Sequence, residues 1–462
     1  MAPLCFKRAR FIIVSLLAAA LLVPAAATAA SAATTSIHVE VRLAALLNGE
    51  RAKHGLPALR TDVRLVASAR SWAKQMAKSG KLSHSSNLSG AMPAGATAWG
   101  ENIASTSASN AADSIHAGLM GSPSHRALIL DGRFSDLGIG VALSGGTMWA
   151  AQHFTAGAPA RVSSAVEPTA DLAVDLFAGG KASHAVIVRD DVFPDSLAAG
   201  PLAGGGGPIL FTPPGPALHP AVRLALEQTL PRGATIWIVG GTAAVSGSVE
   251  AELAGAGWKV RRLSGADRVA TAVAVAYQVA ALRGHPSTVL IAAADDWPDA
   301  ASGGAYGAAS GAPILLAHQS ELPGATAQAL SKLAPKRRVA LGGSAALSDS
   351  VVKKANALRL GGATRQGTSA AVAEELWGRT SAGKAPAWIS TPADGEAWAW
   401  ALGAAPMAAR RAAPVLIAGD PLSKELSSYL AGLGYDGSAS AGLTVHGPVP
   451  AGTADKLRAL LR

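Results

Sequence analysis

Apolar residues follow a helical period early in the chain and a strand-like pattern further on. In VRLAALLNGERAKHG, Leu43, Leu46 and Leu47 form one stripe that ends at Gly55. Asp62 is placed to cap a second helix that ends at Gly80, and the inward face of that helix comprises Leu65, Ala69, Trp72, Ala73 and Met76. Two short runs, 137–143 and 148–154, predict strands. We therefore expect a mixed helix and strand domain over residues 37–158.

The rest of the chain repeats one pattern three times. The segment VFPDSLAAGPLAGGGGPILF (192–211) returns as DWPDAASGGAYGAASGAPILL (296–316), and a third copy carries only PVLI (414–417). In each unit of about 100 residues, apolar strands alternate with helices. Such alternation requires crossover connections and predicts mainly parallel sheets with helices on both faces.

The first 33 residues have the order of a secretory signal peptide. Lys7, Arg8 and Arg10 precede an apolar run over 11–23, and small residues follow, with a cleavage region at 29–33. The run is short for a membrane anchor, so we expect export and no membrane span after removal of the leader. Cys5 lies in this leader and is the one cysteine of the chain, so the mature protein has neither disulfides nor thiolate chemistry.

The charge of the chain gives little support to nucleic acid binding. Three of the positive charges in the net +10 belong to the leader, and the remaining excess is spread over the chain. There is no helix-turn-helix, zinc-finger or aromatic RNA-binding signature. A polyanion site would have to come from local basic clusters, which can equally be solvated loop ends.

Three residues of the first domain carry candidate chemistry. His84, Glu101 and His125 lie in the polar segments LSHSS, WGENIAS and GSPSHRALIL. Two imidazoles and a carboxylate can hold a divalent ion such as zinc, or can act as an acid–base set. Their spacing defines no local ligand motif, so the alternative is three separately hydrogen-bonded loop residues.

The series LLNGERAKHGLPAL, KLSHS, GENIA, SPSHRALIL, LGIGVAL and WAAQHF resembles the bacterial branch of the CAP superfamily, the SCP-like extracellular domains. The resemblance implies an α-β-α sandwich with a cleft lined by His84, Glu101 and His125, and some relatives hold a divalent metal there. Leu119 stands where bacterial members commonly have Trp, and a second cleft glutamate has no counterpart. A fold resemblance does not supply a reaction.

The three repeats show no sign of a catalytic set. Asp195 and Asp299 occupy one repeat position, but Trp400 stands there in the third unit. No nucleophile elbow or recurring carboxylate pair is present. Repeated weak sites suit a repeating polymer through avidity, while the alternative is three copies that only pack together.

The repeats resemble the type 2 cell-wall-binding repeats of Gram-positive surface proteins, with units at 161–262, 263–359 and 360–462. The resemblance implies a pseudo-threefold assembly that holds the protein noncovalently on anionic wall polymers. It implicates the P-I-L element, here Ile209, Leu210, Ile314 and Leu315, although these are by their chemistry buried strand residues. Arg268 and Arg365 could pair with phosphate or carboxylate, or with a neighbouring acid at a contact between units.

The sequence therefore predicts a secreted, wall-associated α/β protein. An α-β-α head of unknown ligand precedes three tandem repeats that bind an anionic cell-wall polymer. The alternative is a metal-dependent cell-wall or peptide hydrolase that acts through the head, with Glu101 as its base and His84 and His125 as metal ligands.

Overall fold

The computed structural model describes residues 25–92, 95–157, 166–378, 388–390, 397–433, 444–446, 449 and 451–460. Most of the predicted signal peptide lies outside the described residues, since the first described element, helix α1 (Ala25–Lys53), begins within it. The predicted cleavage region, 29–33, falls in this helix. No described helix combines the length and the apolar character that crossing a membrane requires.

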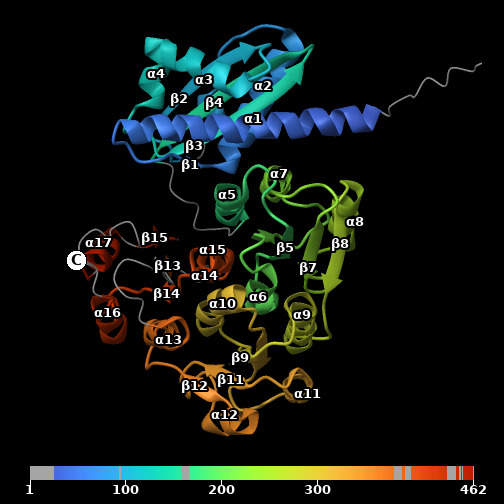
Figure 1. Cartoon of the computed structure of the whole chain (residues 1–462), viewed down its shortest axis with the longest axis vertical. Helices are drawn as coiled ribbons and strands as arrows, with labels where there is room; N and C mark the ends of the chain where they lie inside the picture. The colour runs from blue at the N-terminus through green and yellow to red at the C-terminus, as the bar shows by residue number, and fades with distance from the viewer. Residues whose placement is uncertain are drawn as a thin grey trace, which may run out of the picture.

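The head, residues 25–157, is a four-stranded sheet between two helical layers (Figure 1). The strand order is β1-β3-β4-β2, with β1 parallel to β3 and the other pairs antiparallel. Helix α2 covers one face, while α1, α3 and α4 cover the other. This arrangement confirms the expected α-β-α sandwich. Its elements after α1 are β1 (Arg60–Thr61), α2 (Val63–Ser79), a 3-10 turn (Ser89–Ala91), β2 (Ala98–Thr106), α3 (Ala111–Gly121), α4 (Pro123–Ile129), β3 (Asp136–Ser144) and β4 (Thr147–Ala156).

Local sequence signals fix helix α2 against the sheet. The Asp62 carboxylate accepts hydrogen bonds from the N–H groups of Arg64 and Leu65, and Gly80 ends the helix in the left-handed region at φ 65°. Strand β3 has glycine where the helix crosses it. A Cβ on Gly140 would lie 1.9 Å from the backbone nitrogen of Arg70, so only glycine permits this close approach.

The first two repeats each contain a four-stranded parallel sheet. The strand orders are β6-β5-β7-β8 and β10-β9-β11-β12. The first repeat comprises α5 (Val166–Phe177), β5 (His184–Arg189), η2 (Pro194–Ala198), α6 (Ala199–Ala203), β6 (Ile209–Thr212), α7 (Pro220–Thr229), β7 (Thr235–Val239), α8 (Gly247–Gly255) and β8 (Lys259–Leu263). The second comprises α9 (Arg268–Arg283), β9 (Thr288–Ala293), α10 (Pro298–Ser310), β10 (Ile314–Ala317), α11 (Gly324–Leu333), β11 (Arg337–Leu341), α12 (Asp349–Ala355) and β12 (Leu358–Leu360).

The third repeat follows the same plan over fewer described residues. Its parallel sheet has the order β14-β13-β15. Its elements are α13 (Arg365–Val372), the π-helix η3 (Ala373–Trp377), β13 (Trp388–Ser390), α14 (Ala397–Gly403), α15 (Ala405–Arg411), β14 (Val415–Ile417), α16 (Lys424–Ala431), β15 (Thr444–Val445) and α17 (Ala451–Leu460). The three units confirm the predicted tandem α/β repeats with parallel sheets.

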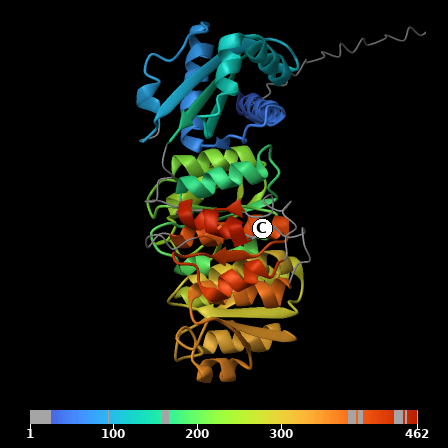
Figure 2. The ribbon, with the colours of Figure 1, turned by 90° about the vertical axis from the view of Figure 1, so that its left-hand side faces the viewer.

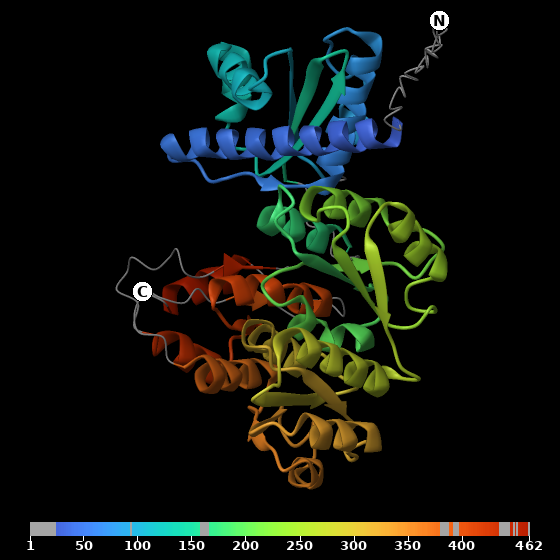
Figure 3. The same cartoon turned by 45° about the vertical axis from the view of Figure 1, so that its right-hand side comes forward.

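The repeats meet around one shared core. Helices α6, α10 and α15, one from each repeat, pack against one another at the centre of the lower body (Figures 1 and 3). Small residues bring them close: a Cβ on Gly200 would lie 2.8 Å from the carbonyl oxygen of Gly304. Trp398 of the third repeat packs edge-on against Phe211 of the first at 5.4 Å between ring centroids. The assembly is therefore closed, with each repeat in contact with the other two, as pseudo-threefold packing requires.

The strands of the P-I-L element are buried in this core. The first residue of each pair, Ile209 or Ile314, faces the core that the repeats share. The second, Leu210 or Leu315, faces the core of its own repeat. All four side chains are at most 2% exposed, so they support the assembly and present no surface to a polymer.

Among the described elements, the head packs mainly on the first repeat, through contacts of α2 with α5 and α7 and of β1 with α5. Figure 2 shows it at one end of an elongated molecule, next to α5 and α7, while the second repeat forms the other end. Direct hydrogen bonds join the two parts. Gln228 Nε2 of α7 donates to Glu40 of α1 at 3.3 Å, and the Asp171 carboxylate of α5 accepts the Val63 N–H at the start of α2, at 2.6 Å. The helix of one domain is thus capped partly by a carboxylate from the other.

Candidate functional site

A buried carboxylate organises the candidate site of the head. Glu101, whose side chain is 2% exposed, accepts three hydrogen bonds. His84 Nδ1 lies 2.7 Å from Oε1, the Ser85 N–H donates to the same oxygen at 2.9 Å, and His153 Nε2 lies 3.0 Å from Oε2. The structure thus brings together His84, Glu101 and His153, the last of which the sequence analysis did not single out.

Strand pairing and the end of α2 build this cluster. Glu101 and His153 are direct cross-strand partners on β2 and β4, and they share the face that α2 covers. The loop after α2 carries His84 over this face, where Trp72 Nε1 of α2 donates to the Ser83 carbonyl at 2.9 Å. The site therefore depends on helix and sheet together.

The hydrogen bonds keep Glu101 ionised despite its burial. Burial alone would raise the pKa of Glu101, but the bonds from His153, Ser85 and His84 outweigh it and leave the pKa below its ordinary value. A carboxylate so held is a weak proton acceptor. It is better suited to orient His84 than to act as a base.

His84 is the group of this cluster that reaches solvent. Its side chain is 61% exposed, and Nδ1 is engaged by Glu101. With the proton assigned to Nδ1 by that bond, Nε2 is left as an acceptor on a largely exposed ring. The pair has the chemistry of a carboxylate-oriented imidazole base.

His125 is not hydrogen-bonded to this cluster. It lies on α4, which packs against the face opposite Glu101, and its carbonyl oxygen accepts a bond from Asn102 Nδ2 at 3.2 Å. In the part of the chain that the structure describes, no group of three or more His, Cys, Asp or Glu is arranged to hold a metal ion. Zinc at His84 and His125 stays a prediction.

A second candidate site lies between repeats, at the carboxyl ends of parallel strands. A cleft of about 410 Å³ is lined by residues that follow β9 and β11 and by the start of α13 in the third repeat. Ligands of open α/β sheets commonly bind at such edges, where neighbouring connections run in opposite directions. Its charged lining comprises Asp295, Asp296, Asp299 and Arg365.

The two arginines predicted to bind polymer have acidic partners in this region. Arg268 Nη1 lies 3.1 Å from Asp295 Oδ1 and also donates to the Ala294 carbonyl. Arg365 of the third repeat lies 3.9 Å from Asp296 of the second. Both side chains remain at least 36% exposed, so they can still reach a ligand.

The recurring aspartates sit beneath glycine turns. Asp299 lies under Gly342, which has φ 101°, and burial raises the pKa of Asp299 to about 6. Asp195 lies under Gly240 in the same way. In the third repeat, Trp400 stands at the aspartate position and His446 at the glycine position. The two rings contact each other at 4.8 Å between centroids, so the aspartate and the glycine are both replaced in this repeat. The sequence shows both changes, but their contact with each other is visible only in the structure.

The geometry defines a class of protein in which an α-β-α head precedes a closed body of three parallel α/β repeats, with a cleft between the second and third. The chain belongs to the cell wall binding domain 2 (CWB2) family, whose model matches residues 155–250, 262–352 and 359–444. The model of the cysteine-rich secretory protein family, CAP, matches residues 44–154. Both families had been expected from the sequence, and both expectations are confirmed.

Known proteins resemble parts of this chain. The N-acetylmuramoyl-L-alanine amidase LytC of Bacillus subtilis is 29% identical over 198 residues, which are 42% of this chain and 38% of LytC. Cwp8 from Clostridium difficile has a TM-score of 0.57 at 26% identity, over 65% of this chain and 50% of Cwp8. Cwp6 from the same organism has a TM-score of 0.57 at 21% identity, over 65% of this chain and 47% of Cwp6. The chain thus spans half or less of these relatives.

Proposed function

We propose that the three repeats attach this protein noncovalently to an anionic cell-wall polymer outside the cell, after export by its leader. Membership of the CWB2 family carries this proposal. The junctions between repeats support it, because Arg268 and Arg365 are exposed there in equivalent positions. Equivalent arginines in two repeats of one closed body would gain avidity against a repeating ligand.

Co-sedimentation of the full chain with purified Gram-positive walls tests the anchor. Binding should weaken with salt and disappear when acid extraction removes the anionic polymers. Arg268→Gln with Arg365→Gln should weaken binding about tenfold, whereas Arg133→Gln, an exposed arginine of the head, should not. Full binding to extracted walls would contradict the anionic polymer.

A second candidate function concerns the head. We propose that it acts as an acid–base hydrolase on wall material, with His84 as the base that Glu101 orients. The 2.7 Å contact between the buried carboxylate and the exposed imidazole favours this function. It changes the roles expected from the sequence, in which Glu101 was the base.

Release of soluble fragments from walls tests the second function. His84→Ala should abolish release, while His54→Ala, another exposed histidine of the head, should leave it unchanged. Metal content measured on the same variants tests the zinc expectation separately. Wall binding without any release by the native chain would leave the head as a binding module and exclude hydrolysis of that substrate.

A further inference from the structure

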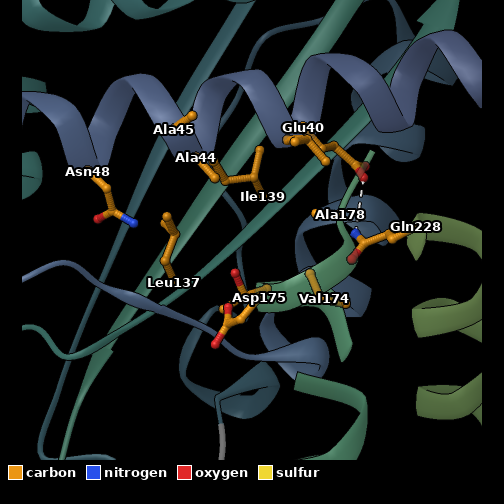
Figure 4. Close-up of a pocket in the computed structure, with 12 residues that line it drawn as sticks. Glu40, Ala44, Ala45, Asn48, Leu137, Ile139, Val174, Asp175, Ala178 and Gln228 are labelled. Carbon is orange, nitrogen blue, oxygen red and sulfur yellow. Dashed lines mark hydrogen bonds between the residues drawn. The ribbon is translucent and has the colours of Figure 1, made fainter. Parts of the chain in front are cut away.

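A cleft lies between the head and the first repeat, at the joint where the two parts contact each other (Figure 4). It has a volume of about 160 Å³, which is enough for a short alkyl chain or several waters. Its apolar lining comes from both domains: Ala44, Ala45, Leu137 and Ile139 of the head, and Val174 and Ala178 of the repeat. The cleft shares no lining residue with the Glu101 cluster or with the cleft between the second and third repeats.

Most polar groups around the cleft already have partners. Glu40 accepts two bonds from Arg70, at 2.8 and 2.6 Å, and one from the Val141 N–H. Asn48 exchanges two hydrogen bonds with the backbone of Leu59. These groups have little capacity left for a ligand.

Two acceptors remain. Gln228 is 3% exposed and donates to Glu40 at 3.3 Å, but its Oε1 is buried without a hydrogen-bond partner. Asp175 lines the cleft from α5, and Figure 4 shows it between Leu137 and Val174. Thr61 of the head donates a hydrogen bond to its carboxylate. Both residues offer hydrogen-bond acceptors next to apolar surface. The cleft therefore suits a ligand that carries a hydrogen-bond donor on an apolar chain.

The charges around the joint favour a cation. From the head, Arg60 pairs with Asp136 at 2.8 Å, and Arg64 pairs with Asp62. On the repeat side, Glu227 is shared by three arginines, Arg70, Arg223 and Arg232. Within the described residues, Asp171 and Asp175, one helical turn apart on α5, form no ion pair. Asp171 is engaged by the Val63 N–H, which leaves Asp175 as the carboxylate without a cation.

We propose that this cleft binds a short aliphatic ammonium group, such as the side chain of a lysine or another diamino acid in a peptide. The ammonium would bond to the Asp175 carboxylate, and its methylene chain would lie over Val174 and Leu137. Because the lining comes from both domains, the ligand would hold the head against the first repeat. This site is independent of the wall-polymer and hydrolase proposals.

Titration of the full chain with Nα-acetyl-lysine methylamide, followed by ligand-observed NMR, tests the proposal. This probe carries one charge, on its ammonium. We expect saturable binding that is at least tenfold stronger than for the Nε-acetylated probe or the norleucine counterpart. Since burial raises the pKa of Asp175 to about 6, binding should weaken as the pH falls below 6.

Two variants separate the site from general charge attraction. Asp175→Asn should weaken binding at least tenfold, and Ala45→Leu, which keeps every charge and fills the cleft, should do the same. Asp349→Asn removes an acid that is 91% exposed in the second repeat and should have no effect. Equal binding to Asp175→Asn and Asp349→Asn, equal binding of the norleucine counterpart, or no saturation would overturn the proposal.

Discussion

Among single residues, Glu101 links the candidate site of the head to the stability of its fold. Its carboxylate is buried, yet it stays ionised because three donors surround it. A charge held in this way stabilises the fold only while it is ionised. Its removal therefore affects both the site and the stability of the domain.

We expect Glu101→Gln to lower the free energy of unfolding by about 2 kcal/mol at pH 7, because charge-assisted hydrogen bonds become neutral ones. The pKa of Glu101 is lowered in the folded state, so its contribution is present above its unfolded value of 4.5 and lost as the pH falls further. Urea denaturation from pH 7 to 3 should show the difference between the native chain and this variant shrinking. Asp113→Asn, at an exposed acid of the head, serves as the control. A difference that persists at pH 3 would contradict the expectation.

The candidate site could be predicted only in part. His84 and Glu101 stood out because polar residues in compact motifs are visible in the sequence. His153 did not, since its contact with Glu101 depends on strand pairing across 52 residues. The signal for it was the alternation in MWAAQHF, where His153 shares a face with buried Ala151. His125 also stood out because it lies in a compact polar motif. The sequence could not show that its helix packs on the face of the sheet opposite Glu101.

At the scale of elements, contact between helix and strand decides the packing of the head. Two glycines of β3, Gly138 and Gly140, leave no side chain between the strand and α2. The backbone of the helix therefore rests directly on the sheet. Any side chain at these positions has to push the two elements apart.

We expect Gly140→Ala to destabilise the head by about 3 kcal/mol, because its Cβ would meet the backbone of Arg70 at 1.9 Å. Gly118→Ala is the matched control. Gly118 lies within α3 with open space around it, so alanine there should stabilise the helix by about 0.5–1 kcal/mol. Thermal unfolding of both variants measures the effect. If Gly140→Ala melted at the same temperature as the native chain, α2 would be able to shift away from the strand without loss of stability.

Most elements could be predicted because their patterns are local. The Asp62 cap, the Gly80 stop and the apolar stripe of α2 are all read within one segment. The π-helical turn at Ala373–Trp377 was not predicted, since π-turns have no sequence period of their own. The close contact of Gly140 with α2 was also missed, because a glycine in a strand only indicates that something approaches closely.

For the whole molecule, the shared core makes the three repeats one structure. Each repeat contributes to a single buried cluster, and Trp398 of the third repeat contacts Phe193 and Phe211 of the first. The repeats should therefore unfold together and not one by one.

We expect Trp398→Ala to lower the stability of all three repeats by about 4 kcal/mol, since it leaves a large cavity in the shared core. Leu282→Ala changes a side chain that is 54% exposed on α9 and should have little effect. Hydrogen exchange followed by mass spectrometry should show faster exchange in strands of every repeat for Trp398→Ala. Faster exchange confined to the third repeat would mean that the repeats unfold independently.

Closure has a consequence for how such proteins can change over time. An open solenoid can gain or lose a unit, because its terminal units cap the stack. Here the third repeat returns to the first, and α6, α10 and α15 fill the centre. A fourth copy could not pack at this centre without separating helices that already contact one another, so gene duplication does not simply lengthen the body. Divergence within a fixed number of copies is the remaining route, and the paired replacement at Trp400 and His446 is an example of it.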